Sequence, residues 1–570
     1  MTRTSSSAAP GAPTLQDFVP LLPAESALLR AAASGDIAKV SLRRPRAATL
    51  DVRLRAGFVS FLARGGSADA RIKGRRLQIV GACIVGTIDL VGASVPMSLW
   101  LYRCLLGAAP RLDGAHVMGS LSFADCAMPG LQAEGCRIDG DLALNAGCSI
   151  DGEIVLTRAR IARDLDCDRM RRGDSAPSEH RFIADGARIG ADVILSGGFE
   201  SVGEIRFMAA QIGGDLRASA ARMTAAIDDT GGRGVALNLD RAQVGGRVIL
   251  NAGFAAAGQV RLHRACIGGD LDCTGAAFDV AGDASWGENR AALLLDRARI
   301  GGALILRQLR EPLQGASLID ARVGTLIDDA SSWGENHVLD GFAYSRLAAD
   351  APTDASMRLG WLERQHALLL GHETRPEPWR RLIKVLRRMG HGRSARDVSI
   401  GRERHLRRAG LIGLGVPPAW RGPVRLAHRM FGLFAGYGHR PLRLLASAAL
   451  LWLLCGAVYW GAETQGAWAP NAALVLAEPR LASCRPECAA LPGTMPRFQP
   501  FLYSLDVLVP LLDLEQERHW APLRHSLARE VEAVIGVPPL QVVTWFEALC
   551  GWLASLTLLA TATGLAQRDR

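Results

Sequence analysis

The sequence predicts a mainly β fold in which a β-solenoid is followed by a helical hairpin and two transmembrane helices. A phrase of the form Ile-Gly-Gly-Asp-Leu recurs at regular spacing, and two uncharged apolar segments of 19 residues lie near the C-terminus. A glycine pair beside a short alternating strand is typical of a solenoid, in which each repeat packs only on its neighbours. We therefore expect four regions: a helical cap (1–70), the solenoid (71–345), a basic helical region (346–440) and a membrane domain (441–570).

The N-terminal region is expected to cover the open first coil, because the terminal coils of a solenoid need a polar cap. A helix is predicted from Pro23 to a stop at Gly35, and a second short helix over residues 55–66. The first ten residues hold no apolar stretch of the kind that a signal peptide requires. The solenoid is therefore expected to remain in the cytoplasm.

The repeats form four pairs, and the two members of each pair lie 23 residues apart. Alternation places Leu271 and Cys273 on one face of a strand and Asp270 and Asp272 on the other. Glycine at the corners is expected to adopt positive φ and to permit close approach of backbones. These features favour a right-handed, pentapeptide-like β-helix with repeats that start at Ile138, Ile161, Ile189, Ile212, Val244, Ile267, Ile300 and Val323.

Three insertions interrupt the repeats, over residues 171–180, 225–234 and 280–290. The phrase Ser-Trp-Gly-Glu-Asn begins at Ser285 and again at Ser332, so one loop was duplicated together with its repeat. Insertions at one register emerge on one face, which can be a binding face. A simple spacer is the other interpretation, and the sequence leaves the role of the duplicated loops open.

A basic helical hairpin is expected after the solenoid. Leu382, Val385, Leu386 and Met389 recur at helical spacing, and a partner helix is predicted over residues 394–408. Between residues 375 and 443 there are 17 Lys and Arg against three acidic residues. Anionic lipid headgroups explain this charge with fewer assumptions than nucleic acid, since no recognition-helix pattern is present.

The two apolar segments predict membrane spans at about residues 443–462 and 541–566. Buried helices of a soluble core are the alternative, and the flanking basic residues argue against it. Five arginines precede the first span, whereas the intervening loop holds nine acidic and six basic residues. The positive-inside rule then predicts an inner-membrane protein with both termini cytoplasmic, and it suggests interfacial anchoring for Tyr459, Trp460, Trp545 and Trp552.

The cysteines agree with this topology. Eight of the twelve fall within the repeats, where a free thiol is expected to act as a small apolar filler. Cys484 and Cys488 lie in the predicted outer loop and are candidates for a disulfide, which we favour over a metal site.

No catalytic, cofactor-binding or metal-ligating residue is assigned from the sequence. Repeated aspartates (Asp141, Asp164, Asp215, Asp270) could bind cations, but capping of turns is the commoner role beside a glycine corner. The apolar segment 500–514 is split by Pro510 and is expected to be interfacial or re-entrant. Three acidic residues in the membrane domain are candidates for a pore or another membrane function: Asp506, Asp513 and Glu547. For Glu547 a position among the outer headgroups remains open.

Three elements together resemble a family of bacterial membrane-associated proteins that join a pentapeptide-like β-solenoid to two C-terminal spans. These elements are the repeats at 77–325, the helix Pro376-Glu-Pro-Trp-Arg-Arg-Leu-Ile-Lys-Val-Leu and the phrase Tyr503-Ser-Leu-Asp-Val-Leu-Val-Pro-Leu. The resemblance covers the chain from about residue 50 onward and implies architecture and location. Members are often named membrane-associated oxidoreductases, but the resemblance supplies no catalytic residues.

The preferred function is a membrane-anchored scaffold whose cytoplasmic solenoid binds an unknown protein partner. A two-span oligomeric channel is the first alternative, and homo-oligomerisation remains open. A redox enzyme is the second alternative, although no dinucleotide-binding Gly-x-Gly-x-x-Gly follows a strand. Nucleic acid is not the expected partner, and no cofactor is inferred.

Overall fold

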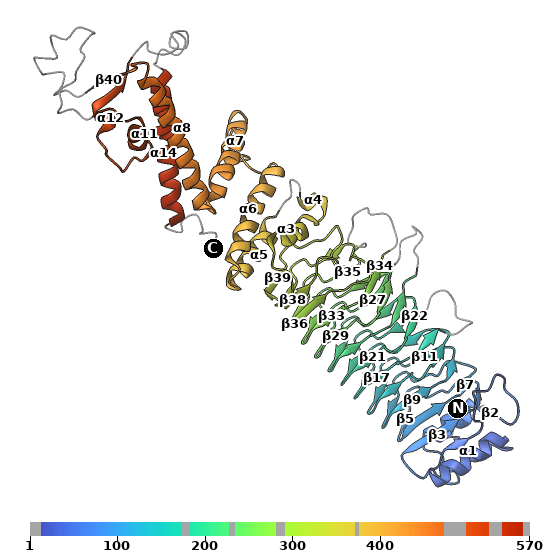
Figure 1. The fold of residues 1–570 in the computed structure, drawn as a ribbon. Helices are drawn as coiled ribbons and strands as arrows, with labels where there is room; N and C mark the ends of the chain where they lie inside the picture. The colour runs from blue at the N-terminus through green and yellow to red at the C-terminus, as the bar shows by residue number, and fades with distance from the viewer. Residues whose placement is uncertain are drawn as a thin grey trace, which may run out of the picture. The chain divides into compact units, whose positions relative to one another are not determined.

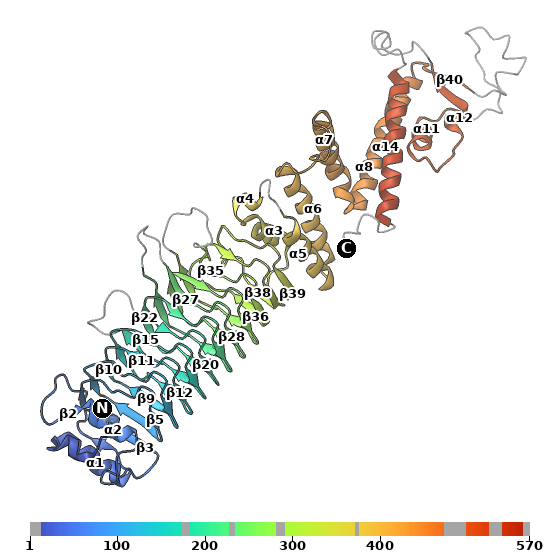
Figure 2. The same ribbon diagram turned by 180° about the vertical axis from the view of Figure 1, so that it is seen from behind.

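A computed structural model describes residues 13–172, 182–226, 234–280, 291–370, 375–471, 497–523 and 539–562. The chain divides into two compact units, Met1–Val398 and Ser399–Arg570. In the first unit, short parallel strands stack as successive coils between α1 and α2 at one end and α3 and α5 at the other (Figures 1 and 2). Long parallel sheets of this kind are compatible with the predicted β-solenoid. Helices account for 30% of the described residues.

The N-terminal end of the first unit is helical, with a 3-10 turn η1 (Leu15–Phe18), α1 (Pro23–Ser34) and α2 (Ala56–Ala63). Gly35 ends α1 with a φ of 84°, which confirms the predicted glycine stop. Glu25 is buried between these helices, where its carboxylate receives the Nε and Nη2 of Arg55 at 2.7 and 2.6 Å.

The largest sheet has 21 strands within the described residues, and all its pairings are parallel. Each coil contributes two short strands, and each strand pairs in register with those of the coils before and after it. Its strands are β1 (Ala38–Lys39), β3 (Arg76–Val80), β5 (Ser94–Val95), β6 (Ser98–Tyr102), β8 (His116–Val117), β9 (Leu121–Ala124), β12 (Arg137–Ile138), β13 (Leu142–Ala143), β16 (Arg160–Ile161), β17 (Leu165–Asp166), β20 (Arg188–Ile189), β21 (Val193–Ile194), β24 (Gln211–Ile212), β25 (Leu216–Arg217), β28 (Gln243–Val244), β29 (Val248–Ile249), β32 (Cys266–Ile267), β33 (Leu271–Asp272), β36 (Arg299–Leu306), β38 (Arg322–Asp328) and β39 (Ala343–Leu347).

Three further parallel sheets complete the coils. A six-stranded sheet consists of β2 (Arg53–Arg55), β4 (Cys83–Val85), β7 (Leu105–Leu106), β10 (Ala127–Met128), β14 (Ser149–Ile150) and β18 (Arg171–Arg172). An eight-stranded sheet consists of β11 (Leu131–Gln132), β15 (Ile154–Val155), β19 (Phe182–Ile183), β23 (Ile205–Arg206), β27 (Val235–Asn238), β31 (Gln259–Arg261), β35 (Leu293–Leu294) and β37 (Ala316–Ser317). A four-stranded sheet consists of β22 (Glu200–Val202), β26 (Arg222–Thr224), β30 (Ala255–Ala257) and β34 (Ala277–Asp279).

The core of the stack is filled by the inward half of each alternating strand. Leu271 and Cys273 are fully buried, as the alternation predicts. Seven of the eight repeat cysteines are buried free thiols, and Cys266 is the exception because it is exposed. The expectation of an apolar filler is therefore wrong for Cys266. It precedes the inward-facing Ile267, and the same alternation turns its side chain outward.

The glycine pairs do not supply positive φ, so that expectation is wrong for them, although glycines at other corners, such as Gly135 and Gly186, adopt it with a φ of 62°. Residues three positions before the repeat phrase adopt positive φ, among them Ala209, Arg241, Arg264 and Arg297 with φ from 54° to 60°. The expected close approach of backbones is confirmed. A Cβ on Gly213 would lie 2.1 Å from the carbonyl oxygen one coil earlier, so only glycine fits between neighbouring coils at this position.

The C-terminal end of the first unit is covered by α3 (Ala355–Glu363), α4 (Ala367–Leu370) and α5 (Glu377–Arg388). Leu382, Val385 and Leu386 are buried, which confirms the predicted helical face. Arg381 donates its Nη2 to the carbonyl oxygen of Tyr344 in β39 at 2.6 Å. The second Trp-Gly-Glu-Asn phrase belongs to this end, with Trp333 and His337 buried, and the first phrase lies outside the described residues.

The second unit contains the two apolar helices, α8 (Pro441–Glu463) and α14 (Pro539–Ala562). Their mean hydropathies are 1.8 and 1.6, and both are long enough to cross a membrane. Between them lie α11 (Pro500–Leu508), α12 (Gln516–His519) and an antiparallel pair, β40 (Trp468–Pro470) with β41 (Trp520–Pro522). The preceding basic helices are α6 (Gly392–Arg408) and α7 (Pro418–Ala435), followed by the turn η3 (Gly436–Gly438).

Candidate functional site

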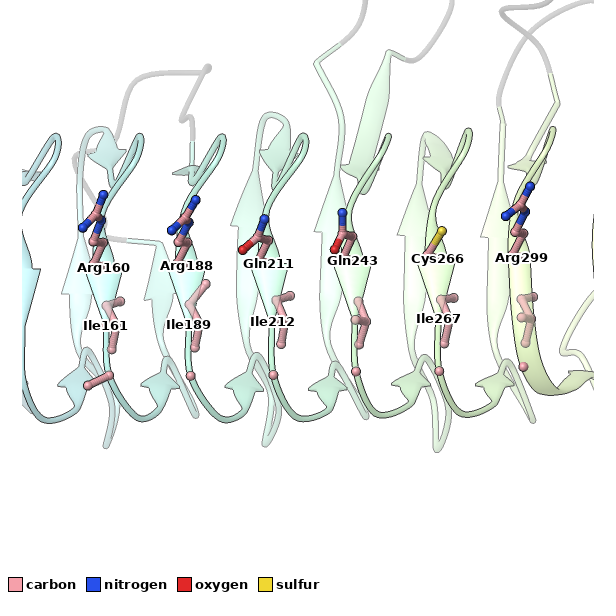
Figure 3. A pocket seen from close by; sticks show the side chains of 18 of the residues that line it. Arg160, Ile161, Arg188, Ile189, Gln211, Ile212, Gln243, Cys266, Ile267 and Arg299 are labelled. Atoms are coloured by element: carbon pink, nitrogen blue, oxygen red, sulfur yellow. The ribbon is translucent and has the colours of Figure 1, made fainter.

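A groove runs along the outer face of the stack in the first unit, with a volume of about 1360 Å³. One column of polar side chains lines it, with one residue from each coil, and Figure 3 shows part of this column side by side. Each of these residues directly precedes an inward isoleucine or valine, so strand alternation turns it outward. The column consists of Arg137, Arg160, Arg188, Gln211, Gln243, Cys266, Arg299 and Arg322.

The floor of the groove is backbone rather than side chain. Two residues beyond the polar column stands a column of small residues, mostly glycine, which also lines the groove. A Cβ on Gly268 would lie 2.2 Å from the carbonyl oxygen of Gly245, so a side chain here would push the two coils apart. The same requirement leaves a trough in which a ligand main chain can approach the coils closely.

Most arginines of this face form no ion pair within the part of the chain that the structure describes, and Arg137 is the exception. Arg137 pairs with Asp139 at 2.8 Å. Within the described residues no ion pair involves six others, which we call the basic strip: Arg160, Arg188, Arg241, Arg264, Arg299 and Arg322. Arg241 and Arg264 belong to the corners just before Gln243 and Cys266 and are exposed. The basic strip therefore supplies a cation on nearly every coil.

Other arginines of the stack reach a carboxylate one coil away. The pairs Arg206–Asp185, Arg217–Asp192 and Arg261–Asp240 have N–O distances of 2.6, 2.8 and 3.0 Å. Like charges on directly opposed strand positions destabilise a sheet, and opposite charges stabilise it. The register pairing of Arg160 with Arg188, without an acid between them, is thus unfavourable unless an anion joins them.

The repeated aspartates form a ladder that bonds one coil to the next. Asp192 accepts the amide of Asp215 at 2.8 Å, and Asp215 accepts the amide of Arg247 at 2.8 Å. They cap backbone amides, as the sequence suggested, but amides of the following coil. Burial acts to raise the pKa of Asp215, yet the hydrogen bonds from the amide and guanidinium of Arg247 outweigh it and hold that pKa below its usual value.

No group of three or more His, Cys, Asp and Glu side chains in the described part of the chain is arranged to hold a metal ion. Cys484 and Cys488, the predicted disulfide pair, lie outside the described residues.

Two of the predicted acidic candidates hold the segment after α11 in place. Asp506 is buried, and its two oxygens accept the amides of Leu514 and Glu517 at 2.8 and 2.9 Å. Asp513 accepts the amide of Glu515 at 3.0 Å and pairs with Arg518 at 3.0 Å. Both carboxylates therefore have local structural partners.

The third candidate, Glu547, is fully buried between α8, α11 and α14. The hydroxyl of Tyr459 donates to its carboxylate at 2.7 Å, and the hydroxyl of Ser504 also donates to it. Tyr459 thus points into the second unit, so the expectation that it anchors at an interface is wrong. Trp460, one residue later, is exposed. Tyr459, Ser504 and Glu547 form a buried polar cluster, in which a polar group needs partners because unpaired burial is costly.

Two features of the site did not emerge from the sequence analysis. The basic strip has a readable signal, because Arg, Gln or Cys stands immediately before the Ile or Val of every repeat. The partnership of Ser504 with Glu547 has no such signal, since 43 residues separate them.

Comparison with known proteins found no matching family model, no matching curated protein and no matching solved structure. Function is therefore inferred from the residues and their geometry.

Proposed function

We propose that the protein is a membrane-anchored scaffold whose β-solenoid presents a cytoplasmic interaction surface to a protein partner. The groove along the stack supports this role, because it is long and open, and most of the arginines that line it form no ion pair with any described residue. A solenoid offers extended surface of this kind because each coil contacts only its neighbours. The column of Arg160, Arg188, Arg299 and Arg322, for which the described residues supply no ion-pair partner, is the single observation that carries the proposal.

The anchor would be α8 and α14, crossing a bacterial inner membrane with both chain ends on the cytoplasmic side. Large apolar side chains are exposed on both helices, which suits contact with lipid: Leu445, Leu450, Leu453, Leu454, Val458, Leu549, Leu553, Leu556 and Leu559. The arginines that precede α8 support this orientation through the positive-inside rule. Anionic headgroups would be the neighbours of that basic region.

The finer architecture in this proposal is a right-handed, pentapeptide-like β-helix. The chain would then belong with the bacterial membrane-associated proteins that it resembles in its repeats and C-terminal spans. The short α11 would be a re-entrant or interfacial segment. Support comes from two contacts that hold α11 on α8. The indole Nε1 of Trp452 donates to the carbonyl oxygen of Phe501 at 2.8 Å, and the hydroxyl of Ser504 donates to the carbonyl oxygen of Trp452 at 3.0 Å.

A scaffold is preferred to an oligomeric channel because of the contacts made by the acidic candidates. Both oxygens of Asp506 accept backbone amides, and Asp513 pairs with Arg518. A ring of acidic side chains that attracts cations in a pore needs carboxylates that face the pore.

The experiment is site-specific photo-crosslinking in native membranes with the full-length chain. A photoreactive residue replaces Gln243 in the groove, and the control carries it at the exposed Arg222 in β26, on another sheet. We expect a discrete protein adduct at position 243 and none at 222, with the protein resisting alkaline extraction from the membrane. Equal labelling at both positions, or release by alkali, would contradict the scaffold or the anchor respectively.

A further inference from the structure

We propose that the groove binds an extended acidic polypeptide segment, laid along the stack with its carboxylates on the basic strip. The inference rests on the proposed scaffold function and adds the chemical class of the partner.

The length of the basic strip sets the length of the segment. Arg160 and Arg322 are joined by six successive register pairings through Arg188, Gln211, Gln243, Cys266 and Arg299. Neighbouring strands lie about 4.8 Å apart, so the strip extends over about 29 Å. An extended chain rises about 3.3 Å per residue, so about nine residues cover the strip.

The charges favour carboxylates as the ligand groups. Arginine binds carboxylate through paired N–H donors, which gives both energy and geometry. An acidic side chain placed between Arg160 and Arg188, or between Arg299 and Arg322, would relieve the repulsion of like charges in register. The exposed amides of Gln211 and Gln243 between these two pairs supply donors and acceptors for the main chain of the segment.

The floor of the groove suits a polypeptide backbone. Gly190, Gly213, Gly245, Gly268 and Gly301 line it and present no side chain. A peptide main chain can therefore lie beside the basic strip while its side chains alternate toward the arginines and away from them.

Single-stranded nucleic acid fits this face less well. Proteins that bind it without sequence preference stack the bases on aromatic side chains, and no aromatic residue lines the groove within the described residues. A duplex presents phosphates on two strands, whereas four of the six arginines of the basic strip (Arg160, Arg188, Arg299 and Arg322) lie in a single column.

The test measures binding of fluorescein-labelled peptides to the purified full-length protein in detergent. The probe is a peptide of about ten alternating Glu and Ser residues, long enough to cover the strip. A Gln–Ser peptide and an oligothymidylate of similar length are the comparisons. We expect the acidic peptide to bind most tightly, with an affinity that falls as salt is added. It should also protect the thiol of Cys266 from maleimide.

Three variants sharpen the test. Arg160→Gln with Arg188→Gln should weaken binding by about 1.5- to 5-fold for each arginine, the range of exposed ion pairs. Gln211→Arg fills the one coil without a cation and should strengthen binding by a similar factor, about 1.5- to 5-fold. Arg222→Gln is the matched control, because Arg222 is exposed on another sheet and pairs with no acidic residue that the structure describes; it should leave binding unchanged.

Tighter binding of the oligothymidylate than of the acidic peptide would indicate that the groove binds nucleic acid and would overturn the proposal. Equal losses in the Arg160→Gln, Arg188→Gln pair and in Arg222→Gln would overturn the site. Failure of the scaffold proposal can be told apart from failure of the acidic-segment proposal. If the membrane crosslink at position 243 forms but the acidic peptide does not compete with it, the scaffold proposal stands and the acidic partner is rejected. If the purified protein binds the peptide but no adduct forms in membranes, the acidic-peptide site stands and the scaffold proposal is rejected.

Discussion

Arg358 in α3 and Asp328 at the end of β38 form a bidentate ion pair, with N–O distances of 2.7 and 2.8 Å, although neither side chain is accessible to solvent. Asp328 also accepts the indole N–H of Trp333 at 2.8 Å, and Arg358 donates its Nε to the carbonyl oxygen of Pro352 at 2.7 Å. The pair thus ties the last coils of the stack to the helices that cover them. Every charged atom has a partner, which is the condition under which a buried ion pair is tolerated.

Asp328→Asn is expected to loosen this end of the stack. It removes the charge that balances the buried guanidinium of Arg358, and breaking a buried pair typically costs about 3–5 kcal/mol. Hydrogen–deuterium exchange should accelerate in β38 and α3 more than in the distant β9. Arg297→Ala is the control, because its pairing with Asp320 is exposed and 3.8 Å long. Equal effects of the two variants would show that the buried pair has no special role.

Substitution of a stacking glycine should destabilise the coils. Gly213→Ala places a Cβ 2.1 Å from the carbonyl oxygen of Gly190, and overpacking of this kind costs about 1–3 kcal/mol or more. Gly360→Ala in α3 is the matched control, since nothing lies within 4 Å of its Cβ position. It should stabilise the helix by up to about 1 kcal/mol. Urea unfolding of both variants measures the difference, and a stable Gly213→Ala would contradict the coil spacing.

Acid should weaken the aspartate ladder through Asp215. Because its pKa is lowered in the folded state, Asp215 contributes stability above its unfolded pKa, and this contribution is lost as the pH falls through the folded value. The stability difference between the protein and Asp215→Asn should therefore be full at pH 7 and shrink below about pH 4. Thermal unfolding across this range measures it. A difference that stays constant down to the acid limit would mean that the carboxylate's charge is irrelevant.

Alternation, the helix stop at Gly35 and the buried face of α5 could be read from the sequence because each depends on local geometry. The position of positive φ could not. The glycine pair suggested itself, yet Arg241 and Arg264 adopt left-handed backbone while the glycines have ordinary φ. Glycine occurs there because a Cβ would clash with the backbone of the neighbouring coil. Contacts between coils cannot be inferred from the sequence of a single strand.

The same limit applies to the candidate site. The outward position of Cys266 follows from the alternation of side chains along a strand, so the basic strip could have been predicted from the sequence. The inward direction of Tyr459 was not, because an aromatic residue near the end of an apolar helix suits either an interface or a buried partner. Only the packing of α11 and α14 on α8 brings Glu547 to its hydroxyl.

Thiol reactivity should separate Cys266 from the core cysteines. The Cys266 side chain is exposed in the groove, whereas burial raises the pKa of Cys136 and of Cys148 to about 12. The thiolate is the reactive form, so the buried thiols are inert in the folded protein. Brief maleimide treatment at pH 7 followed by peptide mass spectrometry should find the label on Cys266 and not on these two. Labelling of Cys148 before unfolding would contradict the packed coils.

The polar cluster of the second unit should behave as one unit in stability. Tyr459→Phe removes the donor to Glu547 and leaves that buried carboxyl group short of a partner, at a cost of about 1–3 kcal/mol. Ser504→Ala removes the other hydroxyl donor. The double variant should lose less stability than the sum of the two single variants, because residues of one network are not independent.

Thr557→Val is the control within α14, since the described residues give its exposed hydroxyl one hydrogen bond, to the carbonyl oxygen of Leu553. Thermal unfolding in detergent, followed by tryptophan fluorescence, reports on this region through Trp468, whose ring is stacked on Phe498. Additive losses, or a Thr557→Val loss as large as that of Tyr459→Phe, would show that the cluster does not hold α8, α11 and α14 together.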